Sequence, residues 1–254
     1  MRKLAILLTA ALLLFPALPA NAEVVRLDSG VTVYTEQDAL RLAREMSPGC
    51  PATEGETSPE ATPEAVAAWV YDLTRVGVPE DFFAGLEVGL APLESLGKDG
   101  DGAVTGRAEA GGKRFVVAAC PVRRIETPVG TLILHAPGLW ENTFLHELGH
   151  LVADVFLGAR GYDWTGASEK GREYLKLRGY PGDKPLDARG QAALPWEERA
   201  SEWFAEDFRV WAWEKVKGAL TESRCAGPLM PVVREFFDRL FGVDRASEPG
   251  IQGD

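Results

Sequence analysis

The chain has 254 residues and a formal net charge of −11, with 38 acidic against 27 basic side chains. A chain this acidic is poorly suited to nucleic acid or to an anionic membrane surface, so we expect neither as a partner. The part that follows the N-terminal segment is about 230 residues long, enough for one large domain or two small ones.

The first 22 residues have the pattern of a secretory signal peptide. Arg2 and Lys3 precede an apolar run at 4–15, and Ala20-Asn21-Ala22 matches a cleavage site. Because the run is too short to cross a bilayer, we expect cleavage after Ala22, a secreted protein and no stable insertion in a membrane.

Three cysteines follow, Cys50, Cys120 and Cys225. An odd number in a secreted protein leaves at least one free thiol or an intermolecular bridge. Cys50 and Cys120 are the first candidates for a disulfide because both lie in the N-terminal half. The sequence is equally consistent with three cysteines that are all buried and reduced. The chain has no C-x-x-C spacing, which argues against a cysteine metal site.

The segment 23–63 reads as an extension ahead of the main domain. Residues 24–27 and 31–34 flank a turn signal and predict a small hairpin, and residues 36–46 predict a helix. Residues 47–63 are Pro, Thr, Glu, Gly and Ser with almost nothing apolar. This composition is typical of a linker or a mobile loop.

The main domain is expected at 64–245, and a disordered tail at 246–254. Residues 62–64 begin a helix that ends near Val76, because a capping threonine, a proline and an acid stand together there. Pro79 to Leu96 is apolar with two glycines, which predicts a broken helix and a loop.

Short strands are predicted next. Residues 98–102 indicate a tight acidic turn, since the further acids of a calcium loop are missing. Residues 104–108 and 113–119 predict a hairpin, and 131–135 predict a strand. The free edge of this last strand can pair with an extended peptide. His135 is expected to have no catalytic role.

The most informative stretch is His-Glu-x-x-His at residues 146–150. His146 and His150 are four residues apart and share one face of a helix, so their imidazoles can bind one zinc ion. Glu147 lies beside them, where its carboxylate can take a proton from a water molecule. The chain has only three histidines, and two are in this motif.

A helix is supported around this motif. Leu145, Leu148 and Val152 recur at helical spacing on a second, apolar face, and Gly158 follows as a stop signal. After it, residues 159–195 contain a predicted helix at 168–178 and a run of turn formers, which together suggest a lid or specificity loop.

The third metal ligand must be a carboxylate, because no histidine follows His150. Asp154 is one turn further on, but three successive turns of one helix cannot easily close a tetrahedral shell. Residues 196–217 predict a second, aromatic-rich helix with acids at four-residue intervals, an arrangement that is unfavourable unless a cation lies there. The candidates are Glu198, Glu202 and Glu206.

Residues 202–209, Glu-Trp-Phe-Ala-Glu-Asp-Phe-Arg, together with His-Glu-Leu-Gly-His, resemble the two metal helices of the anthrax toxin lethal factor catalytic domain family. The secreted Pro-Pro endopeptidases are similar. The resemblance covers roughly residues 100–215. It implies an α+β, zincin-like fold: a small mixed sheet, two metal-binding helices and a mostly helical C-terminal half.

The resemblance also implies roles for individual residues. The ligands of one catalytic Zn²⁺ would be His146, His150 and Glu202, with Glu147 as the general base. Glu206 would accept a hydrogen bond from a ligand histidine, His146 in particular.

One position departs from the family pattern. The family places a tyrosine over the zinc, seven residues before the ligand glutamate, and this position is Pro195 here. Tyr180, Tyr174 or Tyr162 can reach the cleft from the intervening segment instead, and we favour Tyr180 for the transition-state contact.

These features predict a secreted zinc endopeptidase acting on a peptide or protein substrate through a zinc-activated water, with Glu147 as general base. One alternative keeps the enzyme and moves the third ligand to Glu198 or Glu206. The other is a catalytically lapsed extracellular zinc-binding or interaction module. Pro195 favours this second alternative, and Glu147 argues against it because a structural zinc needs no base.

Overall fold

The computed structural model of the protein describes residues 24–46, 57–92, 96, 98–99, 102–103, 106–118, 122–127, 130–135, 139–225 and 227–243. The predicted signal peptide, Cys50, Cys120 and the tail at 246–254 lie outside these residues. Within them, no helix has the length and apolar character needed to cross a membrane.

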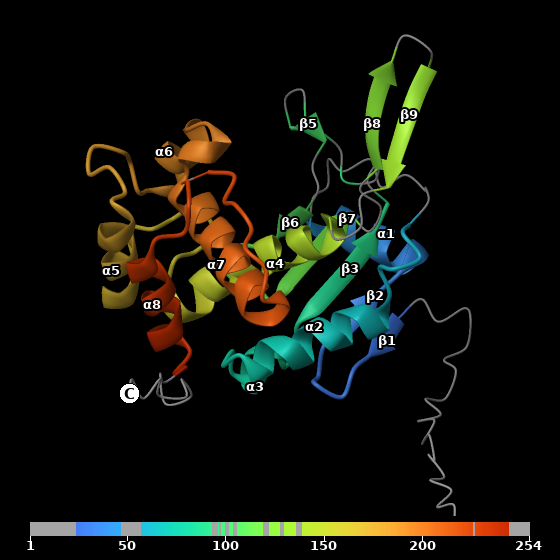
Figure 1. Cartoon of the computed structure of the whole chain (residues 1–254), viewed down its shortest axis with the longest axis horizontal. Helices are drawn as coiled ribbons and strands as arrows, with labels where there is room; N and C mark the ends of the chain where they lie inside the picture. Colours follow the sequence, from blue (N-terminus) through green and yellow to red (C-terminus); the bar gives the residue numbers. More distant parts are fainter. Residues whose placement is uncertain are drawn as a thin grey trace, which may run out of the picture.

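A mixed five-stranded sheet forms one half of the α+β fold (Figure 1). The strand order is β1-β2-β3-β7-β6. The three inner strands are parallel to one another, and the strand at each edge is antiparallel to its neighbour. In this order the bounds are Val24–Arg26, Thr32–Tyr34, Glu87–Ala91, Arg114–Ala118 and Gly106–Ala108.

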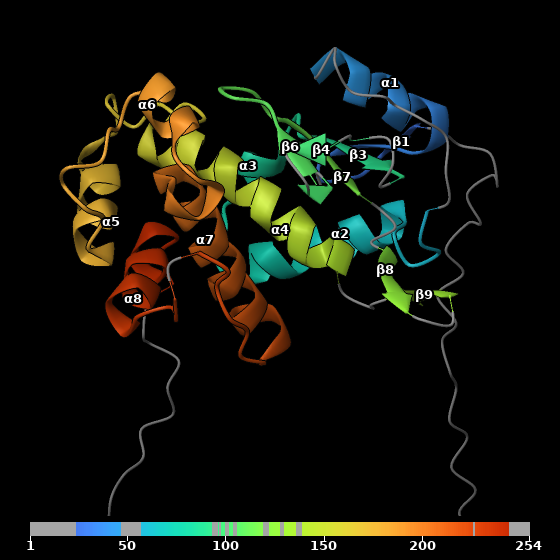
Figure 2. The same ribbon diagram turned by 90° about the horizontal axis from the view of Figure 1, so that it is seen from above.

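The hairpin and helix predicted within residues 24–46 are confirmed, but their assignment to a separate extension is wrong. β2 pairs with β3 from Thr32↔Glu87 to Tyr34↔Gly89. Helix α1 (Glu36–Met46) packs on one face of this sheet (Figure 2). Parallel pairing joins strands far apart in sequence, so the local pattern of residues 31–34 carries no sign of this partner.

The prediction of a broken helix and loop at residues 79–96 is also wrong. Helix α3 (Glu80–Phe83) is short, and the central strand β3 follows it. A strand covered on both faces reads as a continuous apolar run, which does not distinguish it from a buried helix. Gly89 allows close packing here, since a Cβ on it would lie 3.0 Å from Val116.

Helices α2 (Pro63–Arg75) and α4 (Leu139–Val152) cover the opposite face of the sheet (Figure 2). The predicted cap of α2 is confirmed, because the Thr62 hydroxyl accepts a hydrogen bond from the backbone N–H of Ala65 at 3.3 Å. Phe115 on β7 contacts Phe144 on α4, with ring centroids 5.4 Å apart. The sheet thereby fixes the position of α4.

The C-terminal half is helical and packs through aromatic side chains (Figure 1). Phe204 lies between Tyr174 and Phe237, with ring centroids 4.9 and 5.3 Å away. The helices predicted at 168–178 and 196–217 correspond to α5 and α7. The bounds of α5, α6, α7 and α8 are Glu169–Arg178, Ala188–Ala193, Ala200–Lys217 and Pro231–Leu240.

Two small hairpins complete the described strands. β4 (Lys98–Asp99) pairs with β5 (Gly102–Ala103), and β8 (Val122–Thr127) pairs with β9 (Gly130–His135). The strand predicted at 131–135 is therefore confirmed, but it belongs to a hairpin that extends away from the five-stranded sheet in Figure 1. The sheet edge beside α4 is β6.

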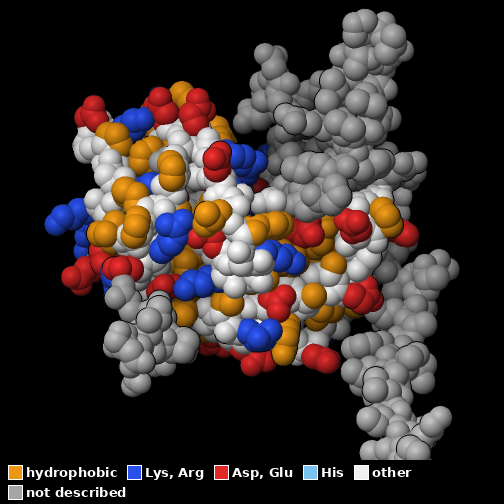
Figure 3. Space-filling view, viewed as in Figure 1, with side chains coloured by type: hydrophobic (Ala, Val, Ile, Leu, Met, Phe, Trp, Pro, Cys, Tyr) orange, Lys and Arg blue, Asp and Glu red, His pale blue; other side chains and the backbone are white. Residues whose placement is uncertain are grey.

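The surface shown in Figure 3 carries charges of both signs. Lys and Arg side chains alternate there with Asp and Glu and with small groups of hydrophobic side chains. The net acidity of the chain is therefore not concentrated on this face.

Candidate metal centre

Two histidines project from one face of α4. His146 and His150 are one turn apart, and their ring centroids are separated by 4.9 Å at an interplanar angle of 88°. Leu145 and Leu148 are fully buried in the main core. The helix continues as a π-helical turn, Ala153–Leu157, and ends at Gly158, which has the left-handed φ of 69° that favours glycine.

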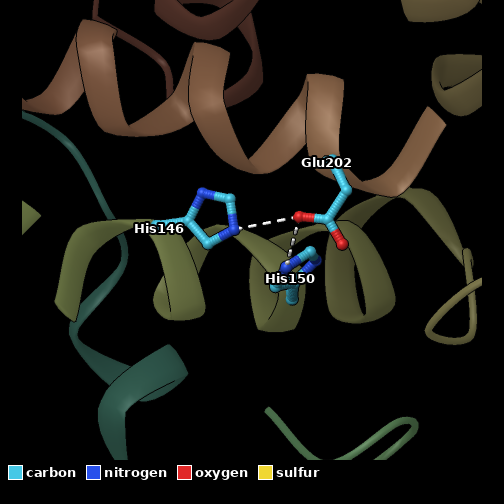
Figure 4. A group of neighbouring side chains, drawn as sticks. All are labelled: His146, His150 and Glu202. Atoms are coloured by element: carbon cyan, nitrogen blue, oxygen red, sulfur yellow. Dashed lines mark hydrogen bonds and ion pairs between the residues drawn. The ribbon is translucent and has the colours of Figure 1, made fainter. Parts of the chain in front are cut away.

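Glu202 reaches the same point from α7 (Figure 4). Its Oε2 atom lies 3.1 Å from Nε2 of His146 and 3.5 Å from Nε2 of His150. One potential ligand atom from each residue lies within 4.8 Å of the others. This buried His–His–Glu group can hold a metal ion.

The two helices approach closely because the residues at their contact are small. A Cβ atom built on Gly149 would lie only 2.8 Å from the Cα of Ala205. Gly149 is the glycine of His-Glu-Leu-Gly-His, and Ala205 lies between Glu202 and Glu206. The close contact therefore brings both carboxylates within reach of His146.

Glu206 holds the ring of His146 in place, as the resemblance implied. Its Oε1 atom lies 2.9 Å from Nδ1 of His146, and the side chain is fully buried. Arg209 and Arg224 both donate hydrogen bonds to the same carboxylate, with distances from 2.6 to 3.2 Å. Because Nδ1 of His146 is bonded to Glu206, the other ring nitrogen, Nε2, faces Glu202.

Sequence reasoning missed the two arginines. Arg209 is three residues after Glu206 on one helix, a spacing that brings side chains together and was available as a signal. Arg209 also donates to Oδ1 of Asn142 at 2.6 Å and to the Glu222 carbonyl at 2.6 Å. Arg224 comes from the segment after α7, which no local pattern links to the site.

The alternatives for the third ligand lie elsewhere. Glu198 belongs to a 3₁₀ turn (Trp196–Glu198) before α7 and pairs with Lys184 at 2.7 Å. The expectation that it stacks with Glu202 on one helix is wrong, because Arg199 is extended and α7 begins only at Ala200. Of the three candidate acids, only Glu202 lies between the two imidazoles.

The carboxylates change the proton affinity of the centre. Burial would lower the pKa of His146, but hydrogen bonds to Glu202 and Glu206 outweigh this effect and raise that pKa to about 9. Burial would raise the pKa of Glu202, but His150 and His146 hold it well below its usual range. Protons and a metal cation therefore compete for this group.

Metal affinity should consequently depend on pH. A metal ligand must be an unprotonated imidazole, so His146 has to lose its proton at any pH below about 9. We expect the apparent affinity for a divalent metal to rise about tenfold per pH unit between pH 7 and 9 and then to level off. Competition with a chromophoric chelator measures this dependence.

The variant Glu206→Gln provides a comparison for this measurement. It removes one negative charge from beside His146, so the plateau should begin at a lower pH than in the wild type. A wild-type affinity that stays flat between pH 7 and 9 contradicts the raised pKa.

Glu147 is buried beneath the edge strand β6. Its side chain is 6% exposed, and burial raises the pKa of its carboxyl group. A Cβ on Gly106 of β6 would overlap the carboxylate of Glu147 in its present position, so the glycine leaves room for it. A raised pKa makes the carboxylate a better proton acceptor. The role of Gly106 was not visible in the sequence.

The structure does not place Tyr180 at the cleft. Its hydroxyl donates to the Glu198 carbonyl at 2.9 Å and accepts from the Gln191 amide at 2.7 Å, so both capacities are used. Tyr174 is fully buried and bonded to Asp207 at 2.8 Å. Among the described residues, Tyr162 is the tyrosine on the cleft wall.

Tyr162 has a hydroxyl hydrogen available for a ligand. Its oxygen accepts from Nη1 of Arg199 at 3.3 Å, and the Arg199 guanidinium lies 5.1 Å from the ring centroid. Burial raises the pKa of Tyr162, which keeps the hydroxyl protonated. The hydroxyl can therefore donate into the cleft.

The metal-binding group opens into a cleft of about 640 Å³, a size typical of ligand pockets. Trp196 stacks on His146 with ring centroids 5.9 Å apart, and Arg224 lies over Trp196 at 5.4 Å. Other lining residues come from β6, the hairpin that follows it, α4 and the loop after α4, among them Arg107, Ala108, Glu109, Ala110, Asp154 and Gly161.

Comparison with protein-family models, curated proteins and solved structures finds no match to this chain. The geometry itself defines a class of site: a buried His–His–Glu group on two helices, with a further glutamate beside it and a cleft in front. The absence of a catalytic role for His135, at the end of β9, stays a prediction.

Proposed function

We propose that the protein is a secreted zinc-dependent peptidase. The observation that supports this most directly is the convergence of His146, His150 and Glu202 from two helices, next to the buried carboxylate of Glu147. A purely structural metal site has no use for a further acid of raised pKa beside the ligands. Secretion rests on the N-terminal sequence pattern alone.

The donor set fits zinc. Two imidazole nitrogens and one carboxylate oxygen are the ligands of many catalytic zinc sites, which keep one position open. The hydrogen bond from His146 to Glu206 is the kind of outer contact that ligand histidines make. When bound, zinc lowers the pKa of a water molecule and polarises a substrate carbonyl.

Glu147 is suited to proton transfer. It accepts a proton as water attacks the peptide carbonyl, and it then donates that proton to the leaving amine. Gly106 keeps β6 clear of its carboxylate.

Strand β6 is suited to binding an extended peptide. The Glu109 N–H donates to the Arg114 carbonyl, so the alternating pattern of an antiparallel pair turns Arg107 toward β7 as well. The backbone groups of Gly106 and Ala108 then face away from β7. Among the described strands this edge of β6 is unpaired, so a substrate that pairs with it lies beside Glu147. We had expected this role for residues 131–135.

A chelation experiment tests the proposed function. The purified secreted chain should cleave members of an unbiased peptide library, lose this activity when a chelator removes its metal, and regain it with zinc. Cleavage that continues in the metal-free protein, or no cleavage with zinc bound, refutes the proposal. The second result would favour a lapsed zinc-binding module.

Tyr162 is the proposed donor to the oxyanion. We expect Tyr162→Phe to lower kcat by about 10²–10³-fold, the usual effect of losing one such donor, with zinc affinity unchanged. Steady-state kinetics and a zinc titration measure the two quantities. Tyr71→Phe is the control, because Tyr71 is 65% exposed on α2 and should behave as wild type. Full activity of Tyr162→Phe would rule out this role.

A further inference from the structure

Strand β6 and helix α4 run in the same direction along the cleft. Gly106, at the start of β6, lies against Glu147. Gly111, in the turn after β6, lies against Asp154, seven residues further along the helix region. The two ends of the segment 106–111 therefore lie beside two positions of the helix region, Glu147 and Asp154.

The far end of this segment is tied to the floor of the cleft. The Asp154 carboxylate accepts from the backbone N–H of Gly111 and from that of Gly161, the latter at 2.8 Å. The two loops also touch, since a Cβ on Gly161 would lie 2.7 Å from the Cβ of Ala110. Gly111 and Gly161 both have left-handed φ, 71° and 57°, which favours glycine.

This contact lies at the C-terminal end of β6, where a peptide paired with β6 would continue. Glu109, Ala110, Asp154, Gly161 and Tyr162 line the cleft at this end. An extended chain that pairs with β6 therefore meets the junction between the hairpin and the loop after α4. It has to end there or turn out of the cleft.

The direction of strand pairing determines which end of the substrate meets this junction. Antiparallel pairing is the more stable arrangement, and it places the N-terminal part of a peptide at the C-terminal end of β6. From Gly106 to Glu109 the strand offers about four positions at roughly 3.3 Å per residue.

On the basis of the proposed function, we propose that the junction of Gly111, Asp154 and Gly161 limits the substrate to about four residues on the N-terminal side of the cleaved bond. The substrates are then short peptides, or proteins cut close to a free N-terminus. A long internal segment of a polypeptide is excluded.

Peptide hydroxamates with two, four, six and eight residues test the length limit. The hydroxamate binds the metal, so that all residues of the probe extend to its N-terminal side. Binding to the zinc-loaded protein is followed through a change in the intrinsic tryptophan fluorescence, to which Trp196, stacked on His146, contributes. Affinity should increase up to four residues and fall roughly tenfold for six and eight. Affinity that keeps rising to eight residues overturns the inference.

A pair of variants tests the cause of the limit. Asp154→Ala removes the acceptor for both loops, so the affinity ratio of the eight- to the four-residue probe should rise toward one. Asp163→Ala is the matched control. Among the described residues its carboxylate accepts from Thr165 within the same loop, so the ratio should keep the wild-type value. An unchanged ratio in Asp154→Ala counts against the junction.

These measurements separate the inference from the proposed function. Hydroxamate binding does not require turnover, so the length limit can hold or fail in a protein that cleaves nothing. Conversely, a protein that cleaves peptides at internal sites, with products mapped by mass spectrometry, remains a zinc peptidase but has no such limit.

Discussion

Replacement of Glu147 by glutamine should leave the metal bound and lower kcat by about 10²–10⁴-fold, the contribution of a positioned proton acceptor. Glutamine has nearly the same shape, so it fits the space that Gly106 leaves under β6. It cannot accept a proton from water at neutral pH. Steady-state kinetics and a zinc titration on the same preparation separate the loss of chemistry from the loss of metal.

The matched control for this variant is Glu197→Gln. Glu197 is exposed in the turn before α7 and lies outside the cleft lining. It should keep wild-type activity. If Glu147→Gln also retained full activity, another group would have to act as the base.

Gly149→Ala should abolish metal binding at zinc concentrations that saturate the wild type. Helix propensity alone favours alanine over glycine by about 1 kcal/mol within a helix. The structure predicts the opposite effect, because the new Cβ would lie 2.8 Å from the backbone of Ala205. The helices must separate, which moves Glu202 away from His146. Overpacking of this kind destabilises a protein by about 1–3 kcal/mol.

Denaturant unfolding and zinc titration measure both effects of Gly149→Ala. Gly166→Ala is the control, since nothing lies within 4 Å of the added Cβ and the residue does not have a left-handed φ. It should keep the wild-type stability and zinc affinity. A stabilised Gly149→Ala protein that still binds zinc would show that the helices do not need this close contact.

The features that could be predicted from the sequence are those that depend on residues close together in the chain. Imidazoles four residues apart define the face of α4, and the cap at Thr62 and the stop at Gly158 follow from neighbouring residues. Glu202 was found because its helix carries a local motif that accompanies His-Glu-x-x-His. In the structure its Oε2 atom lies 3.1 and 3.5 Å from Nε2 of the two histidines.

The errors concern contacts between segments that are distant in the sequence. β3 pairs on both sides with strands that are far away along the chain, so its apolar run was misread. Tyr180 was favoured over Tyr162 from the sequence, but their hydrogen-bond partners and their positions relative to the cleft favour Tyr162. The close contacts of Gly106 and Gly149 are with Glu147 and Ala205, which belong to other elements.

The pairing of β2 with β3 links the N-terminal segment to the wall of the cleft. β3 pairs with β7, β7 pairs with β6, and β6 lies against Glu147. Residues 24–46 are therefore part of the framework that positions the cleft, and a chain that begins at residue 64 would lack part of its core. We expect proteolytic removal of that segment to destabilise the cleft.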